Sequence, residues 1–351
     1  MLKELFLDRV DEVKMLSSGL KNGKDFVLIA PRRFGKTALA HRVLNQISKD
    51  KNFNCISIDI MRCCGSVQSI AETIVEQCLK LLGITGKLQL ILKQLDLSLT
   101  LKLKYNNLEI EPMLQLMKDR SNEYKSLENA LELLEQIAYK TNKNLIVFFD
   151  EFGELNRLGS DTINIFRSVI QLHKKVNYIF AGSQESLMNT IFVDPTGAFY
   201  RFGTLIHLKE LNYNFMADYL TKLKWDFSVA QFLLNQFNCH PYYTATIIKD
   251  IMLDNKIANS IDNFIDYLNQ ILLPQECAYL ELQLVRISSL SSALDIMNKI
   301  AHEITITPNI GTSRQSIYNT LKSLENLGYI NRNGKVLKIT DPLLAIYLRQ
   351  N

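Results

Sequence analysis

The segment Ala30-Pro31-Arg32-Arg33-Phe34-Gly35-Lys36-Thr37 constrains the fold of this chain more than any other. It lies between the apolar run Phe26-Val27-Leu28-Ile29, which predicts a strand, and a helical pattern from Lys36 to Ile47. A loop in that place wraps its backbone N–H groups around phosphate oxygens, while the helix N-terminus points its positive end at them. The segment therefore predicts a phosphate loop at the edge of an α/β sheet.

The residue types of this loop suit a bound triphosphate with magnesium. Lys36 would reach the β- and γ-phosphates, the Thr37 hydroxyl would ligate Mg²⁺, and Gly35 avoids a Cβ that would crowd the ligand. The opening glycine of the usual pattern is replaced by Ala30, the smallest substitute. At least one of the two arginines is expected to pair with a carboxylate. The loop residues expected to contact ATP are Pro31, Arg32, Arg33, Phe34, Gly35, Lys36, Thr37 and Ala38.

A second apolar run, Leu145-Ile146-Val147-Phe148-Phe149, ends in Asp150-Glu151. Asp150 would hold Mg²⁺, directly or through its water, and Glu151 would orient and deprotonate the water that attacks the γ-phosphate. The alternative is that the two carboxylates merely cap a strand and begin a loop. We expect residues 30–37 and these carboxylates to lie side by side, at the carboxyl edge of neighbouring strands.

The first half of the chain alternates strand-like and helical runs. Further strands are predicted at 54–60, 178–181 and 205–208, with a helix from about Val67 to Leu82. Near-continuous apolar runs between helices are typical of a parallel sheet covered on both faces. The leucines between 95 and 103 alternate with polar residues, and Asn106-Asn107 offers a turn. This pattern predicts an inserted hairpin at about 88–115, either an edge of the domain or a partner surface.

The chain has 351 residues, a length for which two or three domains are expected. The pattern from 212 to 270 is wholly helical, and the stretch after about Cys277 mixes helices with a short hairpin. We therefore predict an α/β P-loop ATPase domain at 1–211, a helical lid at 212–272 and a winged-helix domain at 273–351.

Composition limits the class of protein. A net charge of +4 is too small to argue for nucleic acid by itself. No apolar run reaches the roughly 18–20 residues that cross a bilayer, and the charged start is no secretory signal. The six cysteines form no CxxC pair, so reduced thiols in a cytoplasmic protein without a membrane partner are expected.

The C-terminal region predicts a winged helix-turn-helix. Thr312 is expected to cap a helix that places Ile317, Leu321, Leu324 and Leu327 on one face, and Gly328 ends it. An Asn333-Gly334 turn then predicts a hairpin. The free helix face and the wing carry residues able to meet phosphates or bases: Arg314, Gln315, Tyr318, Asn319, Lys322, Arg332, Lys335 and Lys338. From Cys277 onward the sequence contains eight Lys or Arg and five Asp or Glu, so the region is mildly basic. Either DNA or a protein is the possible partner.

Taken together, the motifs resemble the archaeal-type AAA+ ATPase family within the STAND-related P-loop proteins, in particular its bacterial members. The resemblance covers nearly the whole chain and rests on the order of short pieces. After the loop, those pieces are Phe6 to Glu12, Phe149-Asp150-Glu151-Phe152, Phe180 to Gln184, His240-Pro241-Tyr242 and Asp341-Pro342-Leu343-Leu344.

The resemblance implies roles for residues outside the two main motifs. It implies that Arg9 lies beside the adenine and that His240-Pro241 places the lid against the base. The alternative for His240-Pro241 is a helix boundary at Pro241 with a satisfied His240 before it. Ser183 or Gln184 would sense the γ-phosphate or position the water, and the alternative for Ser183 is an ordinary strand-end hydroxyl that satisfies backbone groups. Arg201, where relatives carry a Tyr-Gly-Arg sequence that differs here, would offer its guanidinium to phosphate in its own subunit or in a neighbour's, or else form a surface ion pair.

The resulting expectation is a Mg²⁺-dependent ATPase that couples its nucleotide state to the winged helix and that can form a homo-oligomer. The alternatives are a slow-turnover switch that holds ATP or ADP, and a DNA-binding regulator for which ATP is a ligand.

Overall fold

The chain is described by a computed structural model, which covers residues 8–83, 104–105, 108–109, 122–307, 313–334 and 336–350. Its centre is a sheet of five parallel strands in the order β2-β5-β6-β1-β7. The strands are β1 Phe26–Ile29, β2 Phe53–Asp59, β5 Asn144–Asp150, β6 Val176–Gly182 and β7 Thr204–His207. All five predicted strands are present.

The strand order corrects one expectation. The phosphate loop follows β1 and the two carboxylates follow β5, but β6 lies between these strands, so they are not neighbours. Parallel strands are joined by distant crossovers, and the local apolar pattern of each strand contains nothing that fixes its place in the sheet.

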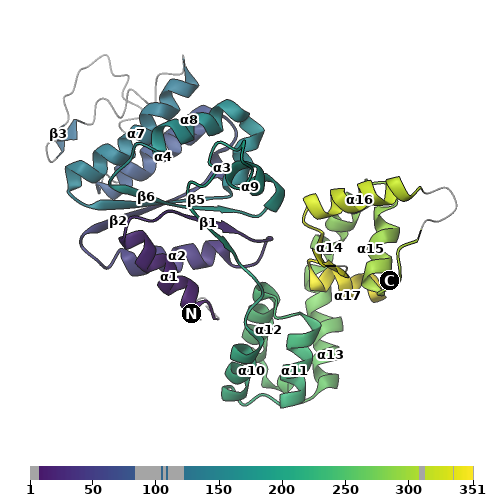
Figure 1. The fold of residues 1–351 in the computed structure, drawn as a ribbon. Helices are drawn as coiled ribbons and strands as arrows, with labels where there is room; N and C mark the ends of the chain where they lie inside the picture. Colours follow the sequence, from purple (N-terminus) through teal and green to yellow (C-terminus); the bar gives the residue numbers. More distant parts are fainter. Residues whose placement is uncertain are drawn as a thin grey trace.

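Helices cover both faces of the sheet (Figure 1). The helices α1 Val10–Lys21 and α2 Lys36–Ile47 lie on one face, and α4 Val67–Leu81, α7 Glu123–Thr141 and α8 Ser160–Ile170 lie on the other. Strand residues alternate between the two cores, so that Phe26 and Leu28 pack towards α1 and α2 whereas Val27 and Ile29 pack towards the opposite layer. Three short elements pack on the same side of the sheet as α4, α7 and α8: α3 Ile60–Cys63, η1 Phe152–Leu158 and α9 Glu185–Phe192.

Part of the predicted insertion is described. Strand β3 (Lys104–Tyr105) pairs antiparallel with β4 (Leu108–Glu109), as the Asn-Asn turn predicts. The other residues of the 88–115 segment lie outside the described residues.

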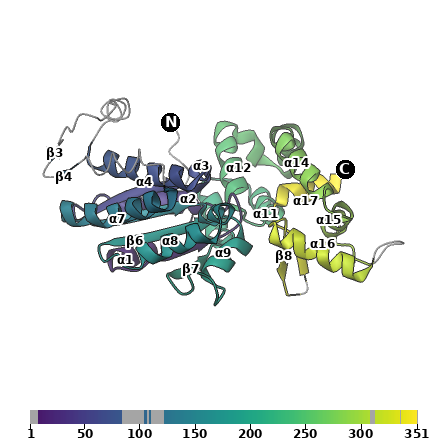
Figure 2. The same cartoon turned by 90° about the horizontal axis from the view of Figure 1, so that it is seen from above.

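The second half of the chain forms one further core. Its buried residues run from Leu211 to Leu348, and we call residues 211–350 the C-terminal unit. Figure 2 shows this unit beside the α/β body, with α12 next to it. Its elements are α10 Tyr213–Lys222, α11 Phe227–Gln236, α12 Pro241–Leu253, η2 Asn255–Asn259, α13 Ile261–Tyr267, η3 Leu268–Leu272, α14 Leu273–Ser288, α15 Ala293–Ala301, α16 Arg314–Asn326, β8 Ile330–Asn333, β9 Val336–Ile339 and α17 Pro342–Gln350.

The start and the apolar face of α16 differ from the expectation. The cap is Ser313, whose Oγ accepts a hydrogen bond from Ser316 N over 3.0 Å, and Thr312 lies outside the described residues. Two adjacent residues that can both cap a helix leave such a boundary open by one position. Leu324 is fully buried, but Leu327 is 58% exposed because it lies past the last turn.

The hairpin after α16 is as predicted. Gly328 has a left-handed φ of 78°, and β8 then pairs antiparallel with β9, with Ile330 opposite Ile339. Among the described residues, no helix has the length and apolar character that a bilayer span requires. The six cysteines are free thiols.

Candidate nucleotide site

The phosphate loop connects the end of β1 to the first turn of α2. Arg33 and Gly35 both have a left-handed backbone, with φ of 66° and 84°, and they flank Phe34. Such alternation turns successive N–H groups towards one side, which creates an anion-binding concavity. Gly35 is also the N-cap of α2, and the first turn of that helix has no acidic residue to oppose an anion.

Lys36 is folded back on this loop. Its Nζ donates to the carbonyl oxygens of Ala30, over 2.8 Å, and Pro31, over 2.9 Å. The side chain is buried, and burial lowers the pKa of its ammonium to about 8, although the charges of Glu151 and Asp150 act in the opposite direction. The ammonium therefore contacts the loop carbonyls and lies within the electrostatic influence of Glu151 and of Asp150, the last residue of β5.

Asp150 and Thr37 are in direct contact. Thr37 Oγ1 donates to Asp150 Oδ2 over 2.6 Å, and Glu151 N donates to Asp150 Oδ1 over 3.1 Å. Burial raises the pKa of Asp150, against the effect of these hydrogen bonds. The phosphate loop and the carboxylates therefore lie side by side, as expected, although the end of β6 separates their strands.

The donor set fits Mg²⁺ better than a metal held by protein ligands alone. Mg²⁺ takes oxygen ligands and is usually bound through one or two carboxylates together with substrate phosphates and water. Thr37 and Asp150 supply a hydroxyl and a carboxylate of that kind. The described part of the chain contains no group of three or more His, Cys, Asp or Glu side chains that could hold a metal ion.

Glu151 is held by the end of β6. Its Oε2 accepts from Ser183 N over 3.0 Å and from Ser183 Oγ over 2.7 Å. Glu151 has a left-handed φ of 49°, a conformation that costs of the order of 1–3 kcal/mol for a residue with a Cβ. Strained residues of this kind gather at functional sites, where surrounding contacts maintain them.

Gln184 has a different partner. Its Nε2 donates over 2.8 Å to Oε1 of Glu154, a carboxylate that is 1% exposed. The other oxygen of Glu154 lies 2.8 Å from Arg157 Nε, in a geometry that makes an ion pair rather than a hydrogen bond. Of the two candidates at the end of β6, Ser183 therefore contacts Glu151, and Gln184 supports the turn that follows it. Glu154 was not predicted, because an acidic residue in a turn gives no local sign of burial.

Three predicted residues lie where the α/β body meets the C-terminal unit. Arg9 is buried at the start of α1, where it donates to Glu12 Oε1 over 3.0 Å and to the carbonyl oxygen of Lys209 after β7. His240 is the N-cap of α12 and Pro241 is its first residue. The His240 ring is buried edge-on against Phe34 of the phosphate loop, with centroids 4.8 Å apart.

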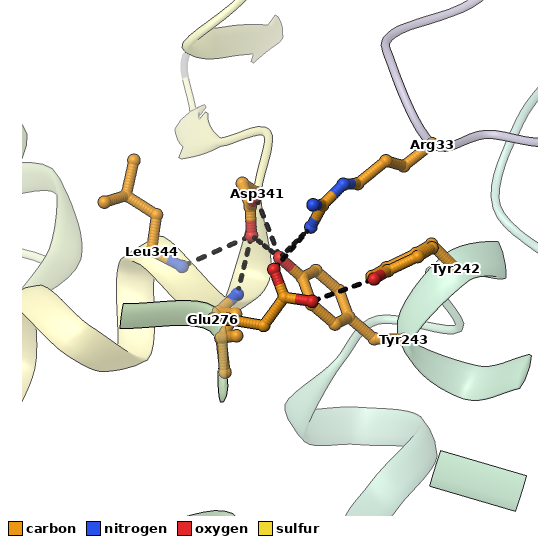
Figure 3. Close-up of polar contacts among 7 residues, drawn as sticks. Arg33, Tyr242, Tyr243, Glu276, Asp341 and Leu344 are labelled. Atoms are coloured by element: carbon orange, nitrogen blue, oxygen red, sulfur yellow. Dashed lines mark hydrogen bonds and ion pairs between the residues drawn. The ribbon is translucent and has the colours of Figure 1, made fainter. Parts of the chain in front are cut away.

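The side chain of Arg33 leaves the loop (Figure 3). Its Nη1 lies 2.9 Å from Glu276 Oε2, so one of the two loop arginines pairs with a carboxylate, as expected. The guanidinium also lies over the rings of Tyr242, at 4.3 Å, and Tyr279, at 3.9 Å. Arg32 is exposed. Glu276 is 243 residues from Arg33 in the chain, and nothing in the sequence pattern connects them.

Arg201 lies away from this cluster. It is exposed in the turn before β7, and β7 starts beside the start of β1, with Thr204 opposite Phe26. Arg201 is therefore at the amino edge of the sheet, whereas the phosphate loop leaves β1 at the carboxyl edge. Arg201 therefore does not contact phosphate in its own subunit, because the length of the sheet separates its guanidinium from the loop.

The basic residues of the C-terminal region lie on α16 and on the hairpin that follows it. Arg314 and Lys322 are exposed on α16, but Arg332 Nε lies 2.7 Å from Glu325 Oε1 in an ion pair. The Arg332 side chain is 47% exposed, so its contact with a partner stays a prediction. Lys335 lies outside the described residues.

Comparison with known proteins places the fold. No protein-family profile matches the chain, and no curated protein matches its sequence. A Walker-type ATPase of Pyrococcus abyssi is similar over 99% of this chain and 97% of that chain, with a TM-score of 0.68 and 18% identity. The ORC2 protein of Aeropyrum pernix, solved as ADPNP–ADP complexes, is similar over 99% and 95%, with a TM-score of 0.59 and 13% identity. The predicted α/β fold with a parallel sheet is therefore confirmed, since this chain shares its fold with both solved structures.

Proposed function

We propose that this chain binds ATP with Mg²⁺ and hydrolyses the bond to the γ-phosphate. The observation that carries the proposal is the contact of Thr37 with Asp150, made beside the Lys36 ammonium at the mouth of an anion-binding loop. A hydroxyl, a carboxylate and an ammonium in this order are what a triphosphate with a divalent cation requires. The nucleotide-bound state of the ORC2 neighbour adds support from a shared fold.

Each residue of the site has its own role in the proposed hydrolysis. Glu151 takes a proton from water, the water oxygen bonds to the γ-phosphorus, and the bond to the β–γ bridging oxygen breaks to leave ADP and phosphate. Both donors of Ser183 reach Oε2 of Glu151, and no described group of the chain hydrogen-bonds to Oε1, which is therefore available for that proton. Lys36 stabilises the charge on the phosphates. When bound by Thr37 and Asp150, Mg²⁺ supplies further charge neutralisation.

Phosphate release by the wild type and by Glu151→Gln tests this proposal. The variant should still bind ATP, and its turnover should fall by about 10²–10⁴-fold, the usual contribution of a general base. Glu132→Gln, on the exposed surface of α7, makes the same change of charge and should behave as wild type. Equal background rates for wild type and Glu151→Gln would contradict hydrolysis and leave the slow switch that holds its nucleotide.

The order of the motifs supports a finer assignment to the archaeal-type, STAND-related branch and its bacterial members. In this proposal residues 1–211 form the ATPase domain, 212–272 the lid and 273–351 the winged helix. The helices α15 and α16 followed by the β8–β9 hairpin have the order that a winged helix requires. Nucleotide state would reach this module through the lid.

Arg201 is proposed to serve a second copy of the chain. Because it lies at the amino edge of the sheet, it can meet phosphate only in a neighbouring subunit of a homo-oligomer. A mixture of the Arg201→Ala and Lys36→Ala variants should then regain ATP turnover, because some mixed interfaces join an intact loop to an intact arginine. A mixture as inactive as its components would contradict this role.

The exposed face of α16 supports DNA contact as a second function. Arg314 and Lys322 are exposed there together with Gln315 and Asn319. Replacing Arg314 and Lys322 by Ala should weaken the binding of a DNA duplex and lower its salt dependence by about one unit for each lost phosphate contact. Arg349→Ala, at the exposed end of α17, is the control. Unchanged DNA binding would favour a protein partner instead.

A further inference from the structure

Arg33 has a backbone conformation that is uncommon for its residue type. It carries a Cβ, yet its backbone is left-handed, and its position lies inside the loop that we propose to bind phosphate. A left-handed conformation is unfavourable for residues with a Cβ, and it persists where surrounding contacts impose it. Gly35 adopts a similar φ in the same loop without that cost.

The contacts that hold Arg33 come from two helices of the C-terminal unit. Glu276 and Tyr279 of α14 and Tyr242 of α12 surround the guanidinium, and only 25% of the side chain is exposed. Glu276 is fixed in turn, because its Oε1 accepts from Tyr242 Oη over 2.8 Å. Both charges of the ion pair are therefore held in place from more than one direction.

The network continues to α17 (Figure 3). Tyr243 Oη lies 3.4 Å from Arg33 Nη1 and donates to Asp341 Oδ1 over 2.9 Å. Asp341 accepts from the backbone N–H groups of Leu343, over 3.0 Å, and Leu344, over 3.3 Å, at the start of α17. One residue of the loop is thus connected to α12, α14 and α17.

We propose that the Arg33–Glu276 pair holds the phosphate loop in its anion-binding shape, so that Glu276 is a positioning residue for the nucleotide. This inference rests on the proposed binding of ATP at the loop. The strained backbone of Arg33 is maintained by contacts of its own side chain, and Glu276 is the charged one among them. Docking of the C-terminal unit and binding of nucleotide then stabilise each other.

A comparison of Ala and Gly at position 33 separates this role from simple adhesion between the two parts of the chain. Arg33→Ala loses the ion pair and keeps the Cβ, so the loop should relax, and Mg²⁺-ATP should bind roughly 5- to 30-fold more weakly. Arg33→Gly loses the same ion pair but adopts the left-handed backbone freely, so it should regain much of the affinity that Arg33→Ala loses.

Glu276→Gln completes the test. It keeps an acceptor for Tyr242 but removes the charge, and in the wild-type background it should weaken Mg²⁺-ATP binding to a degree similar to Arg33→Ala. In the Arg33→Gly background it should have no further effect, because the residue that it positions is absent. Glu281→Gln, exposed on the same helix, is the matched control. Wild-type affinity in Glu276→Gln, or equal losses for Arg33→Ala and Arg33→Gly, would overturn the proposal.

Hydrogen exchange without nucleotide keeps this result separate from the proposed function. The amides of residues 32–37 should exchange roughly 5- to 30-fold faster in Glu276→Gln than in wild type, with urea unfolding used to verify that both proteins are folded. Failure of the wild type to bind ATP would count against the proposed function alone. Unchanged exchange of the loop amides would count against the positioning role alone.

Discussion

The hydroxyl of Thr37 donates a hydrogen bond to Oδ2 of Asp150 over 2.6 Å, although 113 residues separate them in the chain. The contact crosses the carboxyl end of β6, the strand between β1 and β5. Asp150 is 8% exposed, and burial raises the pKa of its carboxyl. A cation near these two oxygens would stabilise the negative charge of the Asp150 carboxylate, which burial disfavours.

Asp150→Asn is expected to remove the effect of Mg²⁺ on ATP binding. The amide oxygen can still accept from Thr37, but the charge that attracts the ion is lost. In the wild type Mg²⁺ should strengthen ATP binding roughly tenfold or more, and in the variant by less than about twofold. Titrations of ATP with Mg²⁺ and with EDTA measure both values, and Asp161→Asn on the exposed start of α8 is the control. An undiminished Mg²⁺ effect would exclude Asp150 as a ligand.

Ser183→Ala is expected to slow turnover without weakening ATP binding. The change removes the 2.7 Å hydrogen bond to Glu151 and leaves the one from the Ser183 backbone. Loss of a partner that orients an active group typically costs about 10- to 100-fold, so kcat should fall by that factor while KM for ATP stays nearly constant. Ser183→Thr restores the hydroxyl and should regain part of the rate. A raised KM at unchanged kcat would place Ser183 on the nucleotide instead.

Much of the α/β body could be predicted, because each element has a local cause. The helix Lys36–Ile47 was predicted with the bounds that the structure has, since the loop fixes its start and its apolar face is regular. The place of β6 between β1 and β5 was not predictable, because a fully buried strand has no edge-specific pattern.

Some contacts at the site join residues that are far apart in the chain, and these contacts were not predicted. Arg33 and Glu276 meet from different parts of the fold, and the partner of a charged side chain cannot be read from its neighbours in sequence. For the same reason the pairing of Arg332 with Glu325 was not predicted. The motif left open whether Arg201 serves its own subunit, a neighbouring subunit or a surface ion pair, because it gives the order of residues along a chain and not the edge of the sheet on which they lie.

Gln184→Leu is expected to destabilise the fold, because it leaves Oε1 of the buried Glu154 without its donor. An unsatisfied buried acceptor costs about 1–3 kcal/mol, and more when it is charged. The Gln184→Leu/Glu154→Leu double variant removes both polar groups and should be less destabilised than the sum of the single variants. Urea unfolding of the four proteins measures the free energies. Strictly additive losses would mean that the two side chains do not interact.

His240 is expected to make the protein sensitive to mild acid. Burial, together with the positive charge of Arg33, lowers the pKa of His240 from 6.5 to about 3. As the pH falls below about 6.5 the unfolded chain takes up this proton and the folded chain does not, so stability present at neutral pH is lost progressively towards pH 3. At pH 5 the loss amounts to about 2 kcal/mol. His240→Gln lacks the titrating group, so the difference in its free energy of unfolding between pH 7.5 and pH 5 should be smaller than that of wild type by this amount, as measured by urea titration at both values. A difference in His240→Gln equal to that of wild type would mean that His240 is protonated in the folded protein at pH 5.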